Sequence, residues 1–299
     1  MKSIGETVKM IRKIKGYTQS EVYSGIMSRS FGHRFESGEN DISATKLFRI
    51  LDNLSISADE FRFIQNNYQQ YTYQAVLQTL MAAYDSHDLQ IMGKIIGDYK
   101  NSPELNLRSV SAIGEILLET YHSKTFRVTS DIQVLWDQLF LAKTWTIQEI
   151  KIAEILLPIA VSLGRQAMIP TIVAQYEENC QRYISESSDP FHISDQLAEV
   201  DLTLIQIYLN LKDYARARGL RSKVTALKPA FLTWQGRFTQ QLVILIWHLY
   251  FGSEDEAAKI SDALTDIESL YSPVIDHNIL AIIDIRQKLA KQYRSAHSA

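Results

Sequence analysis

The 299-residue chain has a single cysteine, Cys180, which excludes an intrachain disulfide framework and fits a reducing compartment. Glycine and proline are also scarce, with 12 and 6 residues. Because sandwiches and barrels depend on many turns rich in these two residues, a many-stranded sheet protein is not expected. The longest apolar runs, such as residues 155–161, are far shorter than the ~20 residues that span a bilayer. We therefore expect a cytoplasmic protein without a membrane partner.

Residue types for metal or nucleophilic chemistry are missing at useful spacings. None of the seven histidines has another histidine three or four positions away, and one cysteine cannot form a thiolate zinc site. The glycines at 93 and 97 lack the spacing of a phosphate-binding loop. Ser43 and Lys46 form a Ser-x-x-Lys pattern, but helix capping explains the serine better. We predict no catalytic residue, no metal and no cofactor, and we do not expect an enzyme.

Charge is distributed unevenly along the chain. The formal net charge is −3, but residues 1–34 hold seven basic and two acidic side chains, a net charge of +5. Affinity for phosphate groups depends on where cations cluster rather than on their sum. The N-terminal part is therefore a candidate for contact with nucleic acid, whereas residues 67–299 carry a net charge of −5.

The first 66 residues have the pattern of a compact five-helix module. Apolar side chains recur every three or four positions between Ile4 and Ile14, and this helix is expected to stop at Gly16. Further helices are expected to begin at four residues whose hydroxyl groups can accept a hydrogen bond from a first-turn amide: Thr18, Ser28, Ser43 and Ser57. A glutamate three positions after Thr18 and after Ser57 completes a capping-box pattern at each.

From residue 67 onward the pattern is helical, and no stretch alternates apolar and polar residues as a strand would. Segments 207–217 and 247–257 match at a spacing of 40 residues, each with an apolar helix, a short turn and a second helix. This weak repeat resembles the helix-pair unit of tetratricopeptide-type arrays. We expect an all-α protein with a five-helix domain at 1–66 and a tetratricopeptide-like domain at 67–299. Such arrays leave a concave surface suited to an extended peptide or another protein.

Segments 18–22, 28–34 and 35–39 resemble the helix-turn-helix of the phage-repressor (Cro/C1 or XRE) class. In that class the second helix of the motif enters the major groove of DNA, while the preceding helix crosses the backbone. The alternative is a small helical bundle with an incidental basic face. The resemblance implies a DNA-binding set made of Gln19 as a phosphate donor and, on the second helix, Ser28, Arg29, Ser30, Phe31, His33 and Arg34.

Other residues that match the class are expected to have structural roles. Gly32 occupies a place where the class usually has an aliphatic core residue, so Phe31 is either a core residue or a contact to a thymine methyl group. Arg12 and Glu36 match the positions that form a buried ion pair in the class.

The resemblance extends beyond this motif. Residues 28–30, 34–39, 42–43, 51–56 and 59–61 are similar to the start of Rgg/GadR/MutR regulators of Gram-positive bacteria, and the length and helical remainder also fit that family. The resemblance implies a cytoplasmic, homodimeric transcription regulator whose helical-repeat domain binds short signalling peptides. RNA polymerase is a further candidate partner.

Polar residues within mostly apolar helices are candidates for a peptide groove, because amide and charged side chains can pair with peptide backbone groups. Most aromatic residues of this part are expected to lie in the core. The candidate ligand-binding set is Glu149, Glu154, Gln175, Asn179, Arg182, Tyr183, Tyr208, Asn210, Arg237 and Gln241.

Taken together, these patterns predict a sequence-specific DNA-binding transcription regulator controlled by a ligand, with a short peptide as the first candidate. Two alternatives stay open. The repeat domain could dock a protein partner, which would make the chain a DNA-bound scaffold. It could also sense a small molecule or pH.

Overall fold

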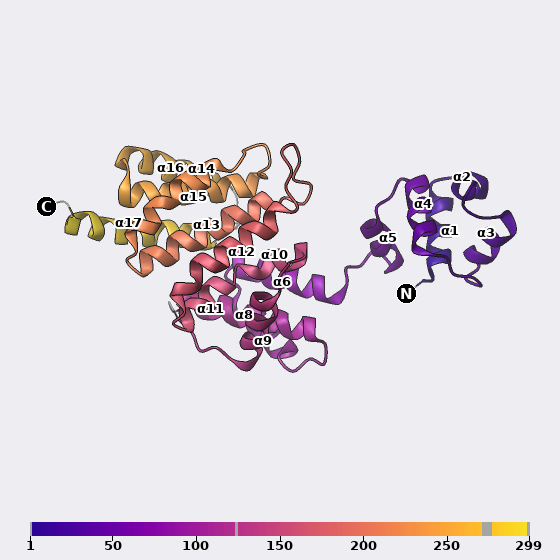
Figure 1. Ribbon diagram of the computed structural model, residues 1–299, viewed down its shortest axis with the longest axis horizontal. Helices are drawn as coiled ribbons and strands as arrows, with labels where there is room; N and C mark the ends of the chain where they lie inside the picture. The colour runs from indigo at the N-terminus through magenta and orange to yellow at the C-terminus, as the bar shows by residue number, and fades with distance from the viewer. Residues whose placement is uncertain (1, 123–124, 271–276, 298–299) are drawn as a thin grey trace. The chain divides into compact units, whose positions relative to one another are not determined.

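The computed structural model describes residues 2–122, 125–270 and 277–297, and every secondary-structure element in these ranges is a helix (Figure 1). The chain divides into two compact units, unit 1 (Met1–Val76) and unit 2 (Leu77–Ala299). The sequence pattern placed the boundary at residue 66, close to the end of α5, whereas the division falls within the following helix, α6 (Thr72–Asp85). Within the described ranges, no helix is both long and apolar enough to cross a membrane.

Unit 1 begins with the predicted succession of short helices. They are α1 (Ile4–Ile14), α2 (Gln19–Tyr23), α3 (Arg29–Glu36), α4 (Ala44–Leu54) and α5 (Ala58–Gln65). The four predicted N-caps are confirmed, since each hydroxyl accepts a backbone amide of the first turn. Thr18 and Glu21 form a full capping box at the start of α2, in which the side chain of each residue accepts a hydrogen bond from the backbone amide of the other. Local sequence therefore fixes where each helix starts.

The core of unit 1 brings α1 directly against the end of α3. A Cβ atom at Gly5 would overlap the Phe35 carbonyl, so only glycine permits this approach. Gly32 lies against the Tyr23 ring, which occupies the space that an aliphatic side chain at position 32 would fill. Phe31 is partly buried and packs at the edge of the same core. Packing against α1 and α2 thus holds α3 in place.

Unit 2 is built from successive helix pairs, as the repeat pattern predicted. After α6 follow α7 (Leu89–Tyr99), α8 (Leu105–His122), α9 (Ser130–Leu141), α10 (Ile147–Ala153), α11 (Leu156–Ser162), the 3-10 turn η1 (Gln166–Met168), α12 (Ile169–Gln181), α13 (Ile193–Asn210), α14 (Tyr214–Ala226), α15 (Trp234–Phe251), α16 (Glu254–Ser269) and α17 (His277–His297). The two matching segments are the α13–α14 and α15–α16 turns. Helices α8, α11, α13 and α15 pack one after another, and α9, α12, α14 and α16 pack on them.

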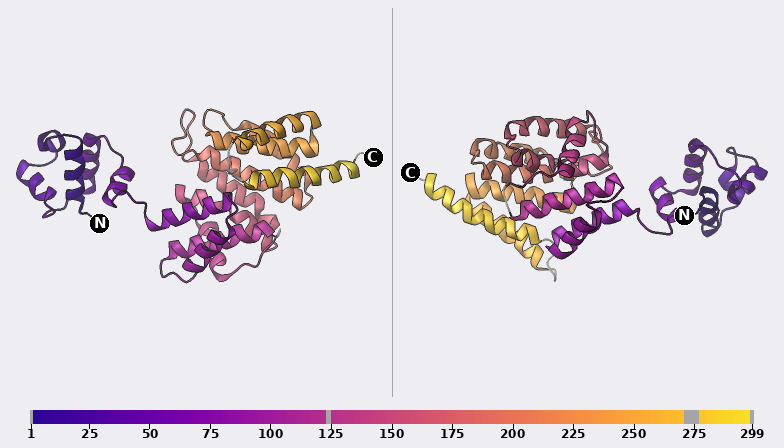
Figure 2. Two further views of the ribbon diagram at one scale, coloured as in Figure 1. Left: turned by 180° about the vertical axis from the view of Figure 1, so that it is seen from behind. Right: turned by 90° about the horizontal axis from the view of Figure 1, so that it is seen from below.

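The last helix of unit 2 returns to the first. Asn278 of α17 donates to the Tyr84 carbonyl of α6 at 3.0 Å. The Nε2 atom of His87, just after α6, lies 2.6 Å from the Asn278 side-chain oxygen. Figure 2 shows the start of α17 close to the end of α6, so the last helix of the array lies next to the first at this point.

Candidate DNA interface and ligand groove

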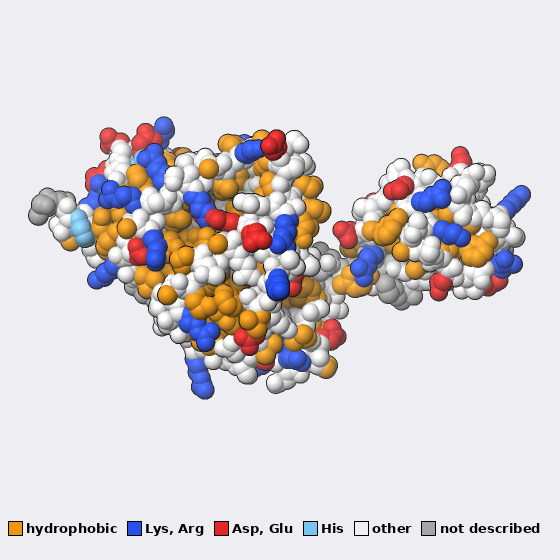
Figure 3. All heavy atoms as spheres, viewed as in Figure 1, with side chains coloured by type: hydrophobic (Ala, Val, Ile, Leu, Met, Phe, Trp, Pro, Cys, Tyr) orange, Lys and Arg blue, Asp and Glu red, His pale blue; other side chains and the backbone are white. Residues whose placement is uncertain are grey.

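The solvent face of α3 carries most of the predicted DNA-binding residues. Exposed side chains on or next to this helix are those of Ser28, Arg29, Ser30, His33 and Arg34. The Ser28 hydroxyl also caps the helix by accepting the Phe31 amide at 3.3 Å. Lys46 of α4 lies over the Phe31 ring at 5.4 Å, which adds a cation that sequence reasoning missed. In Figure 3 Lys and Arg side chains are visible on the surface of unit 1.

A buried carboxylate links α1, α2 and α3. Glu36 is 3% exposed and accepts two hydrogen bonds from the Arg12 guanidinium, at 2.6 and 2.8 Å. Tyr23 donates its hydroxyl to the same carboxylate at 2.7 Å. Burial opposes ionisation of Glu36, but the donors outweigh it, so the pKa of this carboxyl is lowered. The ion pair expected between Arg12 and Glu36 is confirmed.

The Gln19 side chain has a partner inside the module. Its amide donates to Glu36 at 2.9 Å, and because this half-buried amide carries a second hydrogen, its contact to a phosphate group stays a prediction. The interaction joins residues 17 positions apart in the chain, and the helix pattern alone contains no signal for it.

Three predicted ligand residues lie around Trp145 and the α9–α10 connection. Asn179 is 1% exposed; its oxygen accepts the Trp145 amide at 2.7 Å and its nitrogen donates to the Gln175 carbonyl. Gln175 donates its side-chain amide to the Ala142 carbonyl at 2.7 Å, and Tyr183 donates its hydroxyl to the Trp145 carbonyl at 3.3 Å. These polar groups satisfy backbone groups of the α9–α10 connection. Asn179 is therefore a core residue, whereas Gln175 and Tyr183 are half-buried and their place in the ligand set stays a prediction.

Other members of the set also have structural partners. Glu149 completes the capping box of α10 with Thr146. Arg237 donates two hydrogen bonds to the Pro229 carbonyl, and Arg182 pairs with Glu178 at 3.2 Å on the surface. Tyr208 is buried, whereas Gln241 is exposed on α15. None of these contacts brings the five residues together into one site.

The remaining two, Asn210 and Glu154, lie on or beside a continuous polar face of α13. We call it the α13 polar stripe; it consists of Gln196, Glu199, Thr203, Gln206 and Asn210 on the incompletely buried side of α13. Alternating intervals of three and four residues place these side chains on one helix face. The same intervals are visible in the sequence and could have identified the four members that the candidate set lacks.

Neighbouring helices contribute further polar groups to the stripe. Thr203 donates its hydroxyl to the Glu154 carboxylate. Burial raises the pKa of Glu154, and this hydrogen bond offsets only part of the effect. Thr239 of α15 donates to Glu199 at 2.8 Å. At the far end Arg286 of α17 donates to the Asn210 side-chain oxygen at 3.2 Å. The stripe therefore lies between α10, α15 and α17 and offers hydrogen-bond donors and acceptors along one helix.

No family model matches the sequence. The fold, however, is shared with solved structures over nearly the whole chain. A proposed transcriptional regulator from Listeria monocytogenes EGD-e has a TM-score of 0.68 at 18% identity, covering 99% of this chain and 98% of that one. The SHP pheromone receptor Rgg2 of Streptococcus dysgalactiae has a TM-score of 0.63 at 17% identity, with coverages of 97% and 99%.

A third structure, the PrgX/cCF10 complex, has a TM-score of 0.56 at 18% identity, with coverages of 96% and 97%. At these identities the likeness establishes the fold. It confirms the all-helical architecture that the sequence predicted, with a helix-turn-helix module followed by a helical array.

Proposed function

We propose that the protein is a sequence-specific DNA-binding transcription regulator, controlled by a short peptide bound along the α13 polar stripe. The observation that carries the proposal is the shared fold, which spans 97% of this chain and 99% of a protein described as a pheromone receptor. Another structure with this fold is that of a bacterial peptide pheromone/receptor complex, and its description refers to a mechanism of gene regulation. The exposed polar face of α3 and the stripe on α13 supply the two surfaces that such a regulator needs.

The DNA contact is assigned to α3. In a helix-turn-helix the N-terminal part of the second helix reaches base edges in the major groove. Arg29 stands at the first position of α3 and Arg34 lies further along its exposed side, so these arginines are proposed to contact guanines or adjacent phosphates. Ser30 and His33 lie between them as flanking contacts.

We propose a homodimer, because a single helix-turn-helix module is small and contacts only one half of a two-fold symmetric DNA site. One module reads one half-site, and a dimer gains affinity by presenting two modules to double-stranded DNA. The proposed dimer contacts come from unit 2, and the proposed setting is the cytoplasm. RNA polymerase is retained as a candidate partner in activation.

The peptide is assigned to the stripe because its side chains match the needs of an extended backbone. Gln196, Gln206 and Asn210 each offer an amide donor and acceptor, and Glu199 accepts. A bound peptide would favour one arrangement of the dimer over another. Such coupling is typically worth ~1–3 kcal/mol, a roughly 5- to 150-fold change in DNA affinity.

The DNA half of the proposal is tested with full-length protein and sequences selected from random DNA. Arg29→Ala combined with Arg34→Ala should weaken specific binding more than non-specific binding, since a bidentate arginine contact is worth ~1–3 kcal/mol of discrimination. Arg62→Ala, which removes an exposed arginine of α5, is the control. Unchanged operator affinity in the folded double variant would contradict the assignment of α3.

The peptide half is tested by calorimetry with short synthetic peptides, including those encoded beside the selected DNA sites. Gln206→Ala should weaken binding about two- to tenfold, the value of one hydrogen bond of ~0.5–1.5 kcal/mol. Gln90→Ala removes an exposed glutamine from α7 and should leave peptide binding unchanged. Absence of peptide binding, with capture of a folded partner by unit 2, would favour the scaffold alternative.

A further inference from the structure

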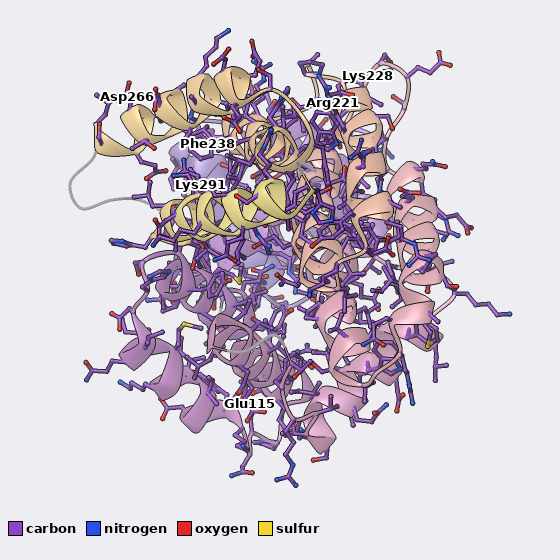
Figure 4. The ribbon with its side chains drawn as sticks, turned by 90° about the vertical axis from the view of Figure 1, so that its left-hand side faces the viewer. Glu115, Arg221, Lys228, Phe238, Asp266 and Lys291 are labelled. Carbon is purple, nitrogen blue, oxygen red and sulfur yellow. The ribbon has the colours of Figure 1, made fainter. Side chains whose placement is uncertain are left out.

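A second polar site lies in unit 2 on the side of α13 opposite the polar stripe. Asp201 follows Glu199 by two positions, which is roughly 200° around the helix axis. It faces a cavity of about 180 Å³ between α12, α13 and α14, lined by Glu177, Gln181, Leu197, Asp201, Lys223 and Leu227. In Figure 4 the labelled residues Arg221 and Lys228 mark the part of the chain that carries Lys223.

The carboxylate of Asp201 is incompletely satisfied. Its side chain is 0% exposed, and neither oxygen accepts a well-directed hydrogen bond from any residue that the structure describes. The nearby cation is Lys223, whose Nζ lies 3.0 Å from Oδ1. That ammonium lies closer to Glu177, at 2.6 Å from Oε1. One cation is therefore shared by two carboxylates.

The charge balance of this cluster favours an additional cation. Two carboxylates share one ammonium. The Glu177 side chain is 38% exposed and is also solvated by water, whereas Asp201 is buried, and an incompletely paired charge away from water is costly. Burial raises the pKa of Asp201 to about 6 in spite of Lys223, so the group is still largely ionised at neutral pH. An anionic ligand would add to the repulsion between Glu177 and Asp201, whereas a cation would relieve it.

The cavity wall indicates which kind of cation fits. Leu197 and Leu227 offer apolar contact to an alkyl chain, and the Gln181 side chain offers an amide. Among the described residues, no group of three or more His, Cys, Asp or Glu side chains could hold a metal ion. We propose that this cavity binds a small organic cation, whose ammonium or guanidinium group pairs with Asp201 while Lys223 stays with Glu177.

The first test is calorimetry on the full-length protein with n-butylammonium, putrescine and agmatine as probes. These cations should bind saturably, whereas n-butanol and butyrate, which have similar chains without the positive charge, should not. Asp201→Asn should weaken binding of each cation at least tenfold. Asp266→Asn removes an exposed carboxylate of α16 and should leave binding unchanged.

The second test uses Lys223→Met, which keeps an unbranched side chain one atom shorter than lysine and removes its ammonium. The variant leaves both carboxylates without their cation, so it should have a lower melting temperature than the parent chain. Butylammonium should raise that temperature more than it does for the parent, and should bind severalfold more tightly. The proposal is overturned if no probe binds the parent chain saturably, or if Asp201→Asn binds the probes equally well. A folded Lys223→Met chain that no amine stabilises would also overturn it, and if that variant does not fold, the Asp201→Asn comparison decides.

Discussion

Replacing Glu36 by alanine should bring the helix-turn-helix module close to its unfolding midpoint while leaving the helical array intact. Glu36 at the end of α3 accepts hydrogen bonds from Arg12 on α1 and from Gln19 and Tyr23 on α2, so its carboxylate joins three helices. The substitution leaves the Arg12 guanidinium, which is only 12% exposed, without its counter-ion. It also strands the buried Tyr23 hydroxyl.

The expected loss is comparable with the stability of the whole module. Removing one partner of a buried ion pair costs ~3–5 kcal/mol, because the other charge stays buried and unpaired. A module of about 65 residues has a free energy of unfolding of roughly 3–10 kcal/mol at ~0.05–0.15 kcal/mol per residue. Glu36→Ala should therefore bring the module close to its unfolding midpoint. Acid should act similarly: the lowered pKa means that the stabilisation from ionised Glu36 is present above about pH 4.5 and is lost as the pH falls through the folded-state pKa.

Hydrogen exchange followed by mass spectrometry on the full-length chain measures both units at once. Backbone amides of α1 to α5 should lose protection in Glu36→Ala, whereas amides of unit 2 should exchange as in the parent, because the two units have separate cores. Glu39→Ala, which removes an exposed carboxylate three residues away, is the control. Equal protection of α3 in the Glu36→Ala variant and the parent would refute the central role of the network.

Three other substitutions test the structural assignments. Asn179→Ala should lower the free energy of unfolding of unit 2 by ~1–3 kcal/mol, measured by urea titration, because the Trp145 amide loses its buried acceptor. Asp201→Asn should raise the free energy of unfolding at pH 7.5 by at most about 3 kcal/mol, since its pKa rises from 3.8 to about 6 at ~1.4 kcal/mol per unit. That gain should shrink as the pH falls through 6 and vanish below about pH 4, because Asp201 is then protonated in both the folded and the unfolded state. A gain that does not depend on pH would contradict the desolvation of Asp201. Tyr23→Phe should cost ~1 kcal/mol in module stability by thermal denaturation, because the Glu36 carboxylate loses the hydrogen bond from the buried hydroxyl, and an unchanged melting temperature would contradict this role.

Local signals in the sequence were sufficient to predict the helix starts. Thr18 and Ser28 cap α2 and α3 as expected, because a capping hydroxyl acts on amides two or three residues away. The Arg12–Glu36 pair spans 24 positions and was accessible only through the resemblance to a known class. The same carboxylate binds Gln19, and no local pattern distinguishes an amide that meets a buried acid from one that meets a phosphate.

The ligand set was harder to predict, because a polar residue in an apolar helix has two possible explanations. Asn179 satisfies the backbone of Trp145, 34 residues earlier, and this pairing exists only once α12 is packed against the start of α10. Composition cannot separate that role from a place in a groove. Spacing adds information that composition lacks, because Gln196, Glu199 and Thr203 follow the intervals of one helix face, whereas the predicted ligand residues are spread over several helices.

The two polar surfaces of α13 differ in what they do for stability. On the stripe, Glu199 and Asn210 already have donors from Thr239 and Arg286, so these carboxylate and amide groups are held in fixed positions before a ligand arrives. Preorganised hydrogen-bonding groups lose less entropy on binding, which favours an extended ligand of defined sequence. Asp201, on the other side, is buried with too few donors, and its folded-state pKa is raised accordingly. A buried group that lowers stability without completing its own hydrogen bonds is poorly explained by packing, and a ligand that supplies the missing donor would recover the loss.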